Sequence, residues 1–367
     1  MSDQVLPADA ASAAPRSARR RGGDWLLVLR QNGSLLFAIA LFALLYLGYH
    51  LAHPRGFTTQ VLVQNANEAF TLAMVAMAQT IPVLLGGLDL SVGAVMTMVN
   101  CIASHLVIGS PGQIALGILA CLASGALAGF VNGCVVVYGR IPPIIATLAT
   151  AAIAIGVALL LRPTPGGKLD EDLNWAMTNS VADFAETFGL ADGGKAPWLA
   201  PVAWLPVPVV LLVLVVVLVW LPFRRTVTGR TIYAIGSSES AAYMSGLPLN
   251  RAKIAAFTLA GFFAGVGGLF LAIQTSSGNA DLPQAGAYTL NSIASVVIGG
   301  TSLVGGSGGP VGSIFGTLVL RVISFGFRVF DIPPLLQPLF EGLVLLAAVS
   351  LGAARALRVR NTLDLFR

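Results

Sequence analysis

Charged residues are scarce in this chain. Only 10% of the 367 residues are Asp, Glu, Lys or Arg, whereas 56% are hydrophobic and the mean hydropathy is +0.83. An ordinary soluble domain carries about a quarter charged residues, so this composition excludes that class. The composition instead indicates an integral membrane protein with several helices.

Residues that bind metals or catalyse reactions are also few. Cys101, Cys121 and Cys134 lie in apolar runs without metal-ligand spacing, and the apolar segments show no His/Asp/Glu constellation of an active site. We therefore expect no metal, no cofactor and no catalytic residue. The net charge of +5 does not indicate nucleic-acid binding, because the cations flank apolar runs and do not cover a soluble domain.

About ten apolar segments are candidates to cross a bilayer, counted in units of about twenty residues. We predict an all-α integral membrane fold, a polytopic helical bundle of about ten transmembrane helices. The predicted spans are Ser34–Ala52, Phe70–Leu85, Ser91–Ile108, Gln113–Val137, Ile144–Leu161, Leu205–Pro222, Ile254–Ile273, Asn291–Val304, Val311–Phe327 and Leu335–Ala354.

The positions of the cations predict which segments face the cytoplasm. With both termini cytoplasmic, 15 of the 21 Lys and Arg residues lie inside, 4 lie outside and 2 lie within spans. This topology divides the chain into a disordered N-terminal tail (1–30), a transmembrane domain (31–354) and a C-terminal tail (355–367). The domain contains an external loop at 162–204 and a cytoplasmic loop at 223–253.

Residues 223–253, called the island below, are a polar and basic stretch between two long apolar runs. They hold five cations and one carboxylate, Glu239. Ser237 or Ser238 can cap a short helix that begins near Glu239, and Gly246 followed by Pro248 ends it. A short helix in a cytoplasmic loop is a surface on which a soluble partner can act. A solvated loop that merely joins two spans explains the pattern equally well.

Two other segments interrupt the apolar pattern. The first, Gly86–Gly93, combines glycines with Asp89 and Ser91 between two spans. It is either a tight turn in which Asp89 or Ser91 caps the next helix, or a mobile gate. The second, Gly299–Pro310, has six glycines in twelve residues and no cation, so we expect a turned connection and no phosphate site.

Small residues also recur at helical spacing within three spans. Glycines four residues apart let membrane helices approach closely, so these positions predict packing seams. They are Gly125, Gly129 and Gly133, then Gly261 and Gly265, then Gly312 and Gly316.

Four motifs follow one another along the chain. Gly86–Gly93 reads GGLDLSVG, Gly139–Leu148 reads GRIPPIIATL, Gly229–Gly236 reads GRTIYAIG, and Gly299–Leu303 reads GGTSL. With these motifs in this order and at this spacing, residues 57–351 resemble the permease subunits of bacterial ABC importers for ribose, xylose, arabinose, fructose and galactofuranose. Departures from the family pattern include Arg321 inside a span and a long, acidic external loop at 162–204.

The resemblance implies a multi-pass subunit of the bacterial inner membrane that moves a monosaccharide by alternating access. The implied partners are cytoplasmic ATP-binding subunits, a second permease chain that is identical or different, a periplasmic sugar-binding protein and membrane lipid. ATP hydrolysis belongs to a partner. In the family the cytoplasmic loop docks on the ATPase, so the implied coupling residues here are Arg230, Glu239, Ala241, Ala242, Ser245 and Gly246.

The residues themselves indicate two further groups of candidate site residues. The gate or turn group is Gly86, Gly87, Asp89, Ser91 and Gly93. Neutral sugars need hydrogen-bonding groups, and the amides of the spans are candidates to line a path: Asn65, Asn67, Gln79, Asn132, Gln274 and Asn291. Each amide is also explained by a hydrogen bond between helices. Arg321 and Glu341 are a possible ion pair between spans.

The sequence leaves alternatives for the function. An ABC permease for another small solute, such as a nucleoside, an amino acid or a signalling sugar derivative, fits the same features. An ATP-independent carrier or channel would need a titrating carboxylate in the membrane, for which Glu68 and Asp89 are the candidates. The sequence does not identify the solute.

Overall fold

The computed structural model describes residues 33–190, 199–343, 346–347 and 350. The predicted tails at 1–30 and 355–367 lie outside the described residues, as does part of the loop at 162–204. Between the helices, the described residues form two isolated β-bridges, Gly166 with Gly278 and Ser180 with Pro206. The predicted all-α class is confirmed.

The helices follow the apolar runs of the sequence. They are α2 (Gly33–Ala52), α3 (Thr59–Leu84), α4 (Val92–Leu106), α5 (Pro111–Tyr138), α6 (Pro143–Leu161), α7 (Glu171–Thr178), α8 (Val181–Thr187), α9 (Val207–Val215), α10 (Leu221–Arg225), α11 (Val227–Ser237), α12 (Glu239–Met244), α13 (Leu249–Thr275), α14 (Leu282–Ile298) and α15 (Pro310–Val329). A π-helical turn, η2 (Val216–Trp220), joins α9 to α10, and a short 3-10 turn, η3 (Pro334–Leu336), follows α15.

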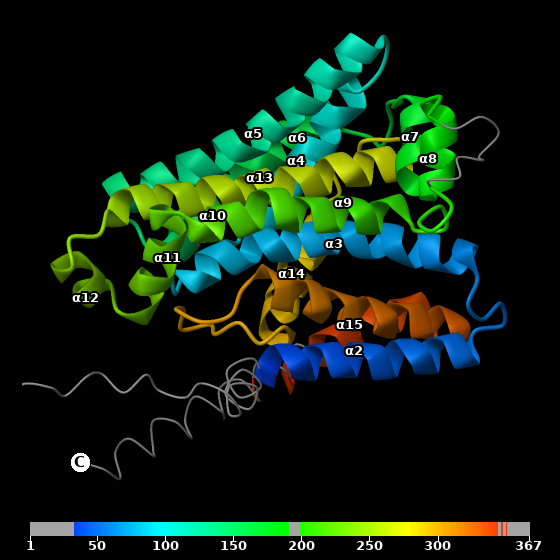
Figure 1. Cartoon of the computed structure of the whole chain (residues 1–367). Coiled ribbons are helices and arrows are strands. Elements are labelled where there is room, and N and C mark those ends of the chain that lie inside the picture. The colour runs from blue at the N-terminus through cyan, green and yellow to red at the C-terminus, as the bar shows by residue number, and fades with distance from the viewer. Residues whose placement is uncertain (1–32, 191–198, 344–345, 348–349, 351–367) are drawn as a thin grey trace, which may run out of the picture.

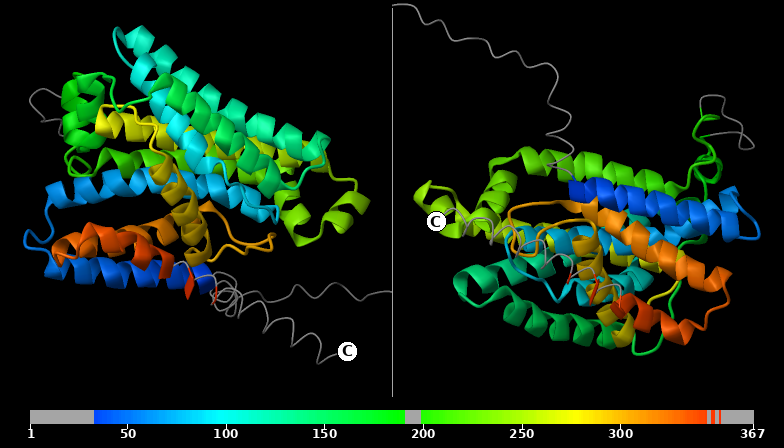
Figure 2. Two further views of the ribbon diagram at one scale, coloured as in Figure 1. Left: turned by 180° about the vertical axis from the view of Figure 1, so that it is seen from behind. Right: turned by 90° about the horizontal axis from the view of Figure 1, so that it is seen from below.

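Most of the long helices lie side by side, as does the continuous segment from α9 through α10 (Figure 1). Four of the short helices close the two ends of the bundle. Helices α7 and α8, from the predicted external loop, lie at one end. Helices α11 and α12, from the island, lie at the opposite end with the loop that joins α14 to α15. Views from behind and from below show the same two ends of the bundle (Figure 2). The two loops that the charge pattern assigns to opposite sides of the membrane are thus far apart.

The central helix is α13, which packs against α3, α4 and α5. Its contact with α5 is made by glycines. A Cβ atom on Gly129 would meet the carbonyl oxygen of Phe257, and one on Gly261 would meet that of Gly125. The backbones therefore touch, and the packing seam predicted from the glycine spacing is confirmed.

Six helical segments within the described residues are long and apolar enough to cross a membrane. They are α2, α5, α6, the continuous segment from α9 through α10, α13 and α15, and they match six of the predicted spans. α4 is apolar but has only 15 residues. α3 has 26 residues and holds more polar side chains. The chain is thus a multi-pass membrane protein.

The predicted span Asn291–Val304 is wrong at both ends. α14 begins earlier, at Leu282, because Asp281 accepts the Gln284 N–H as an N-cap and Pro283 suits a first turn. It ends at Ile298, because Gly299 and Gly300 open the glycine-rich loop. The predicted span Leu335–Ala354 overlaps a helical stretch at 337–343 and then extends beyond the continuously described residues.

Candidate functional site

The motifs of the sequence come together at the end of the bundle that carries the island. The end of α3, helix α11 and the loop between α14 and α15 pack there backbone against backbone. Gly306 N–H donates to the Leu84 carbonyl oxygen at 3.0 Å, and a Cβ atom on Gly236 would collide with both groups. Only a residue without a side chain fits at Gly236, so this glycine lets three distant segments meet.

The turn Gly86–Gly93 joins α3 to α4 and is enclosed by the same structure. Gly86 has a left-handed backbone (φ 81°), and a Cβ atom there would lie 2.9 Å from the Val304 carbonyl oxygen. Gly93 faces the Ala285 carbonyl of α14, and its N–H donates to Thr289 Oγ1 at 3.2 Å. The turn is therefore held by the glycine-rich loop on one side and by α14 on the other.

Polar side chains hold the turn from within. The Ser91 N–H and hydroxyl both donate to Asp89 Oδ1, at 2.8 and 2.6 Å. Asn132 of α5 donates to Ser91 Oγ at 2.9 Å. The Gln79 amide of α3, oriented with its nitrogen toward the Asp89 carbonyl, donates at 2.7 Å and accepts the Asp89 N–H at 3.3 Å. Two of the predicted path residues, Gln79 and Asn132, thus bind the turn.

The two polar side chains of the turn are almost completely shielded from solvent, with Asp89 2% and Ser91 1% exposed. Burial raises the pKa of the Asp89 carboxyl, and the hydrogen bonds from Ser91 lower it in part. Ser91 begins α4, but its side chain caps no amide of that helix. The explanation of Ser91 as a capping residue is therefore wrong, because its hydroxyl is already engaged by Asp89 and Asn132.

Sequence reasoning missed two threonines that bind this turn. Thr147, in the GRIPPIIATL motif, accepts the Leu90 N–H at 3.0 Å, and Thr289 accepts the Gly93 N–H. Thr147 is fully buried, and Thr289 is 8% exposed. The only signal in the sequence was the position of Thr147 inside a motif.

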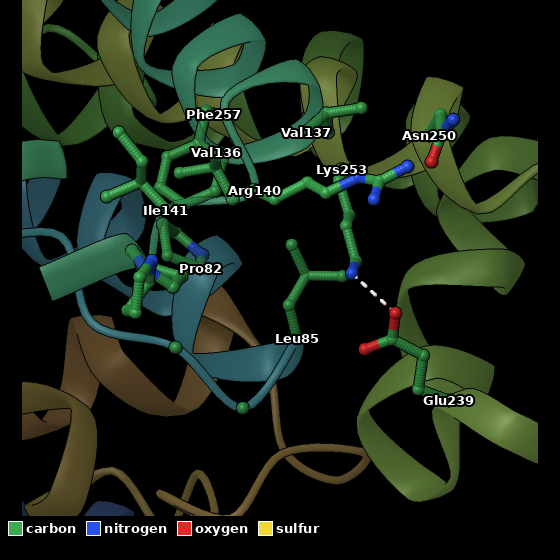
Figure 3. Close-up of a pocket in the computed structure, with 14 residues that line it drawn as sticks. Pro82, Leu85, Val136, Val137, Arg140, Ile141, Glu239, Asn250, Lys253 and Phe257 are labelled. Atoms are coloured by element: carbon green, nitrogen blue, oxygen red, sulfur yellow. Dashed lines mark hydrogen bonds and ion pairs between the residues drawn. The ribbon is translucent and has the colours of Figure 1, made fainter.

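A cavity of about 430 Å³ opens between the turn, the α5–α6 connection and the island (Figure 3). Its apolar wall comes from the end of α3 and from the two prolines that begin α6. Its polar groups are Arg140, Glu239, Asn250 and Lys253. Arg140 has a left-handed backbone (φ 53°), which lets the chain reverse between α5 and α6. Two of the four motifs and the island therefore border one cavity.

The short helix predicted in the island is α12. Ser238 accepts the Ala241 N–H at 3.3 Å, Glu239 lies in the first turn, and Gly246 (φ 72°) follows the last turn. The predicted cap and the predicted stop are both confirmed. The coupling candidates Glu239, Ala241, Ser245 and Gly246 are exposed, and Ala242 is buried. Arg230, on α11, is exposed and donates to the Arg225 carbonyl at 2.9 Å.

An ion pair joins α12 to α13. Lys253 Nζ lies 2.6 Å from Glu239 Oε1, and the two side chains point toward one another at the cavity (Figure 3). The two side chains are 24% and 56% exposed, respectively. Solvent therefore screens the pair, so it contributes only weakly to holding α12 beside α13.

Lys253→Ala is expected to change the free energy of unfolding by no more than about 1 kcal/mol, because partly exposed ion pairs contribute little. The melting temperature of the purified protein, measured at low and high salt, tests this. Arg251→Ala, a nearby cation without an ion pair among the described residues, is the matched control. A much larger loss for Lys253→Ala than for the control would contradict the expectation.

The other path candidates bind different elements and do not gather around one space. Asn67 of α3 donates to the Thr178 carbonyl of α7 at 2.7 Å. Asn65 of α3 is buried, and Gln274 of α13 is half-buried. Asn291 of α14 donates to Glu341 Oε2 at 2.8 Å. Hydrogen bonds to neighbouring elements thus account for four of the six amides. These are Asn67 and Asn291 here, and Gln79 and Asn132 at the turn.

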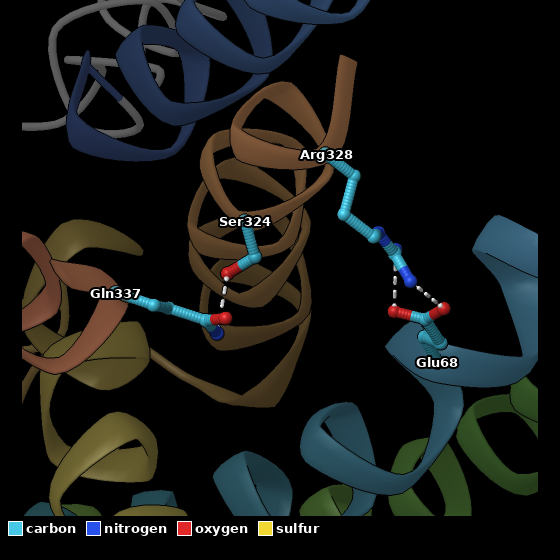
Figure 4. Close-up of polar contacts among 4 residues, drawn as sticks. All are labelled: Glu68, Ser324, Arg328 and Gln337. Atoms are coloured by element: carbon cyan, nitrogen blue, oxygen red, sulfur yellow. Dashed lines mark hydrogen bonds and ion pairs between the residues drawn. The ribbon is translucent and has the colours of Figure 1, made fainter. Parts of the chain in front are cut away.

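Two carboxylates lie among α3, α14 and α15. Glu68 accepts two bonds from Arg328, at 2.6 and 2.7 Å (Figure 4). Glu341 accepts from Gln337 at 2.7 Å and from Asn291, and the same figure shows Gln337 beside Ser324. Arg321 instead lies over the ring of Tyr288, 5.7 Å from its centroid. The possible pair between Arg321 and Glu341 is therefore not formed.

Within the described residues the structure is a helical membrane bundle with a short, capped and exposed helix at one end. The comparison with known proteins shows its family. Residues 61–349 match the family described as branched-chain amino acid transport system / permease component. The chain belongs to this family of permease components.

Similar proteins include two ribose import permeases and a fructose import permease. The chain is 31% identical to the ribose import permease of Haemophilus influenzae, covering 89% of this chain and 93% of the relative. It is 33% identical to that of Bacillus subtilis, covering 77% and 81%. It is 31% identical to the fructose import permease of Rhizobium meliloti, covering 80% and 77%. No solved structure matches.

Proposed function

We propose that this chain is the transmembrane permease subunit of an ATP-driven importer for a monosaccharide. The observation that carries the proposal is the similarity, along most of the chain, to permeases whose names specify ribose or fructose import. The family description mentions branched-chain amino acids. We favour a sugar over an amino acid as the solute, because relatives at 31 to 33% identity are named as sugar permeases. A permease of the autoinducer 2 import system of Escherichia coli is also similar, at 27% identity, and supports a signalling molecule less strongly.

The proposed arrangement has about ten spans in the bacterial inner membrane with both termini in the cytoplasm. The six apolar segments long enough to cross a membrane support it, as do α3, α4 and α14 beside them. The island and the glycine-rich loop then face the cytoplasm, and α7 and α8 face the periplasm. The proposed partners are ATP-binding subunits, a second permease chain and a periplasmic sugar-binding protein.

In this proposal α12 transmits the movement of the ATP-binding subunit. Its exposed positions Glu239, Ala241, Ser245 and Gly246 form the contact, with Arg230 beside them on α11. The ion pair to Lys253 joins α12 to α13, the central helix, and α12 also packs against α11. A push on α12 would reach the turn Gly86–Gly93 through α11, because Gly236 of α11 packs against the Leu84 carbonyl just before the turn.

The turn Gly86–Gly93 is proposed as the inner gate. Its hydrogen bonds come from α3, α5, α6 and α14, so a relative movement of these helices would open it. The path itself is proposed to pass among the other amides of the spans, Asn67, Gln79, Asn132, Gln274 and Asn291, whereas Asn65 lies at the groove described below. A neutral sugar would exchange hydrogen bonds with such groups without the cost of burying a charge.

The proposal predicts that Ala241→Trp abolishes sugar-stimulated ATP hydrolysis. Ala241 is exposed on α12 in an ordinary helical conformation, so the large side chain leaves the fold intact and blocks a partner at this surface. ATP hydrolysis is measured in liposomes that contain this chain, the ATP-binding subunits and the binding protein. Each sugar in a panel that includes ribose and fructose is added separately.

The matched control is Tyr138→Trp, at the 72%-exposed end residue of α5 outside the island. The control is expected to retain full stimulation. Equal loss in both variants would refute the role of α12. Solute flux through this chain with no ATP-binding subunit present would refute the importer and favour a carrier or channel.

A further inference from the structure

A groove and a polar basin adjoin each other at the end of the bundle opposite the island. The acyl groove, of about 270 Å³, lies between α2 and α9 over α3 and α15, and its lining includes Phe42, Leu62, Ala66, Val209 and Val322. The head-group basin, of about 360 Å³, is lined by polar side chains that include His53, Arg55, Gln60, Gln64, Arg328 and Asp331. Asn65 and Phe325 line both, so the two spaces meet there.

The groove lies on an apolar face of the bundle. The helices on either side of it expose large apolar side chains, such as Leu44 and Leu47 on α2 and Val213 on α9. Tyr46 and Trp204 line the groove as well, and these residue types favour the boundary between hydrocarbon and water. A groove with apolar walls on such a face can take up a lipid acyl chain.

Asn65 stands where the two spaces join. It is 6% exposed, and it interacts with the phenol of Tyr46, but its amide nitrogen completes no hydrogen bond. The amide carries two N–H groups, and the phenol oxygen of Tyr46 can accept at most one of them, so an acceptor for the other is expected beside it. A phospholipid has an ester carbonyl between each acyl chain and the phosphate, and this carbonyl is such an acceptor.

The basin offers one cation and one carboxylate to a head group. Arg328 already binds Glu68 through two bonds. Arg55 donates only one long bond, of 3.3 Å, to Gln60. Asp331 is exposed and makes no ion pair with any described residue. A phosphate suits Arg55 and a protonated amine suits Asp331, so the charges complement a zwitterionic head group with a primary amine.

We propose that this groove and basin bind one phosphatidylethanolamine molecule. One acyl chain fills the groove, the ester carbonyl accepts from Asn65, the phosphate binds Arg55 and the ammonium binds Asp331. With the topology proposed above, the lipid belongs to the outer leaflet of the inner membrane. The site depends only on the chain being in a membrane, so it stands or falls independently of the transported solute.

Native mass spectrometry of the full-length chain tests the site. The detergent-solubilised protein is mixed with equal amounts of phosphatidylethanolamine, phosphatidylcholine and phosphatidylglycerol that carry the same acyl chains. The wild type is expected to retain about ten times more phosphatidylethanolamine than either competitor. Each competitor lacks the primary amine and therefore one charge-assisted hydrogen bond. Arg55→Ala and Ala66→Phe are expected to lower this retention about tenfold, by removing the phosphate contact and by filling the groove.

Asp331→Asn separates the head group from the rest of the lipid. This exposed substitution leaves the fold intact and is expected to remove the preference for phosphatidylethanolamine over phosphatidylcholine, because it removes the partner of the amine. The control variants Arg251→Ala and Ala126→Phe lie at a second apolar groove, between α5 and α13, and are expected to behave as the wild type. Equal retention of the three lipids, a preference for phosphatidylglycerol, or equal losses in the controls would overturn the proposal.

Discussion

Gly236→Ala is expected to abolish sugar-stimulated ATP hydrolysis and to lower the melting temperature of the purified protein. A Cβ atom at this position would collide with the Leu84 carbonyl and the Gly306 amide, and both are backbone groups that cannot rotate away. Forcing extra volume into such a contact costs about 1–3 kcal/mol or more. The cost here falls where α3, α11 and the glycine-rich loop meet, so the damage reaches the motifs of the site.

Gly286→Ala in α14 is the matched control, because a Cβ atom there meets no other atom within 4 Å. Alanine in place of a helical glycine reduces the entropy lost on folding and stabilises by about 0.5–1 kcal/mol. The two variants are therefore expected to shift the melting temperature in opposite directions. Equal shifts, or full ATP hydrolysis in Gly236→Ala, would show that the three segments need not be in contact.

Gly129→Ala is expected to destabilise the protein by about 1–3 kcal/mol through overpacking. This glycine lies in the seam between α5 and α13, where its added Cβ atom would meet the Phe257 carbonyl and lie 3.0 Å from Gly261 Cα. The two helices would have to separate along the central contact of the bundle. Thermal unfolding in one detergent measures the loss, and the yield of monodisperse protein provides a second readout.

The matched control for the seam is Gly156→Ala on α6, where no atom lies within 4 Å of the added Cβ. It is expected to be neutral or slightly stabilising. A loss of stability in the control as large as in Gly129→Ala would mean that alanine harms any helix of this bundle. The close approach of α5 and α13 would then not be the cause.

Much of the fold was predictable because the membrane makes local composition decisive. An apolar run must form a helix in a bilayer, since its backbone has no water to bind, and six predicted spans coincide with helical segments long enough to cross a membrane. Capping is local too, so Ser238 and Gly246 correctly marked the ends of α12. The span at Asn291–Val304 failed, because residues 282–290 are not a purely apolar run, yet α14 begins there with a cap at Asp281.

The sequence by itself determined the class of protein, the family motifs and the short helix of the island. Only the tertiary structure decided how the motifs are joined. Gly236 meets Leu84 and Gly306, and Asn132 meets Ser91, across long separations in sequence. In the tertiary structure, most of the candidate path amides donate hydrogen bonds to neighbouring elements. The physical reason is that composition and periodicity report on the solvent around each helix, whereas contacts between helices depend on shape and on buried groups that must find partners.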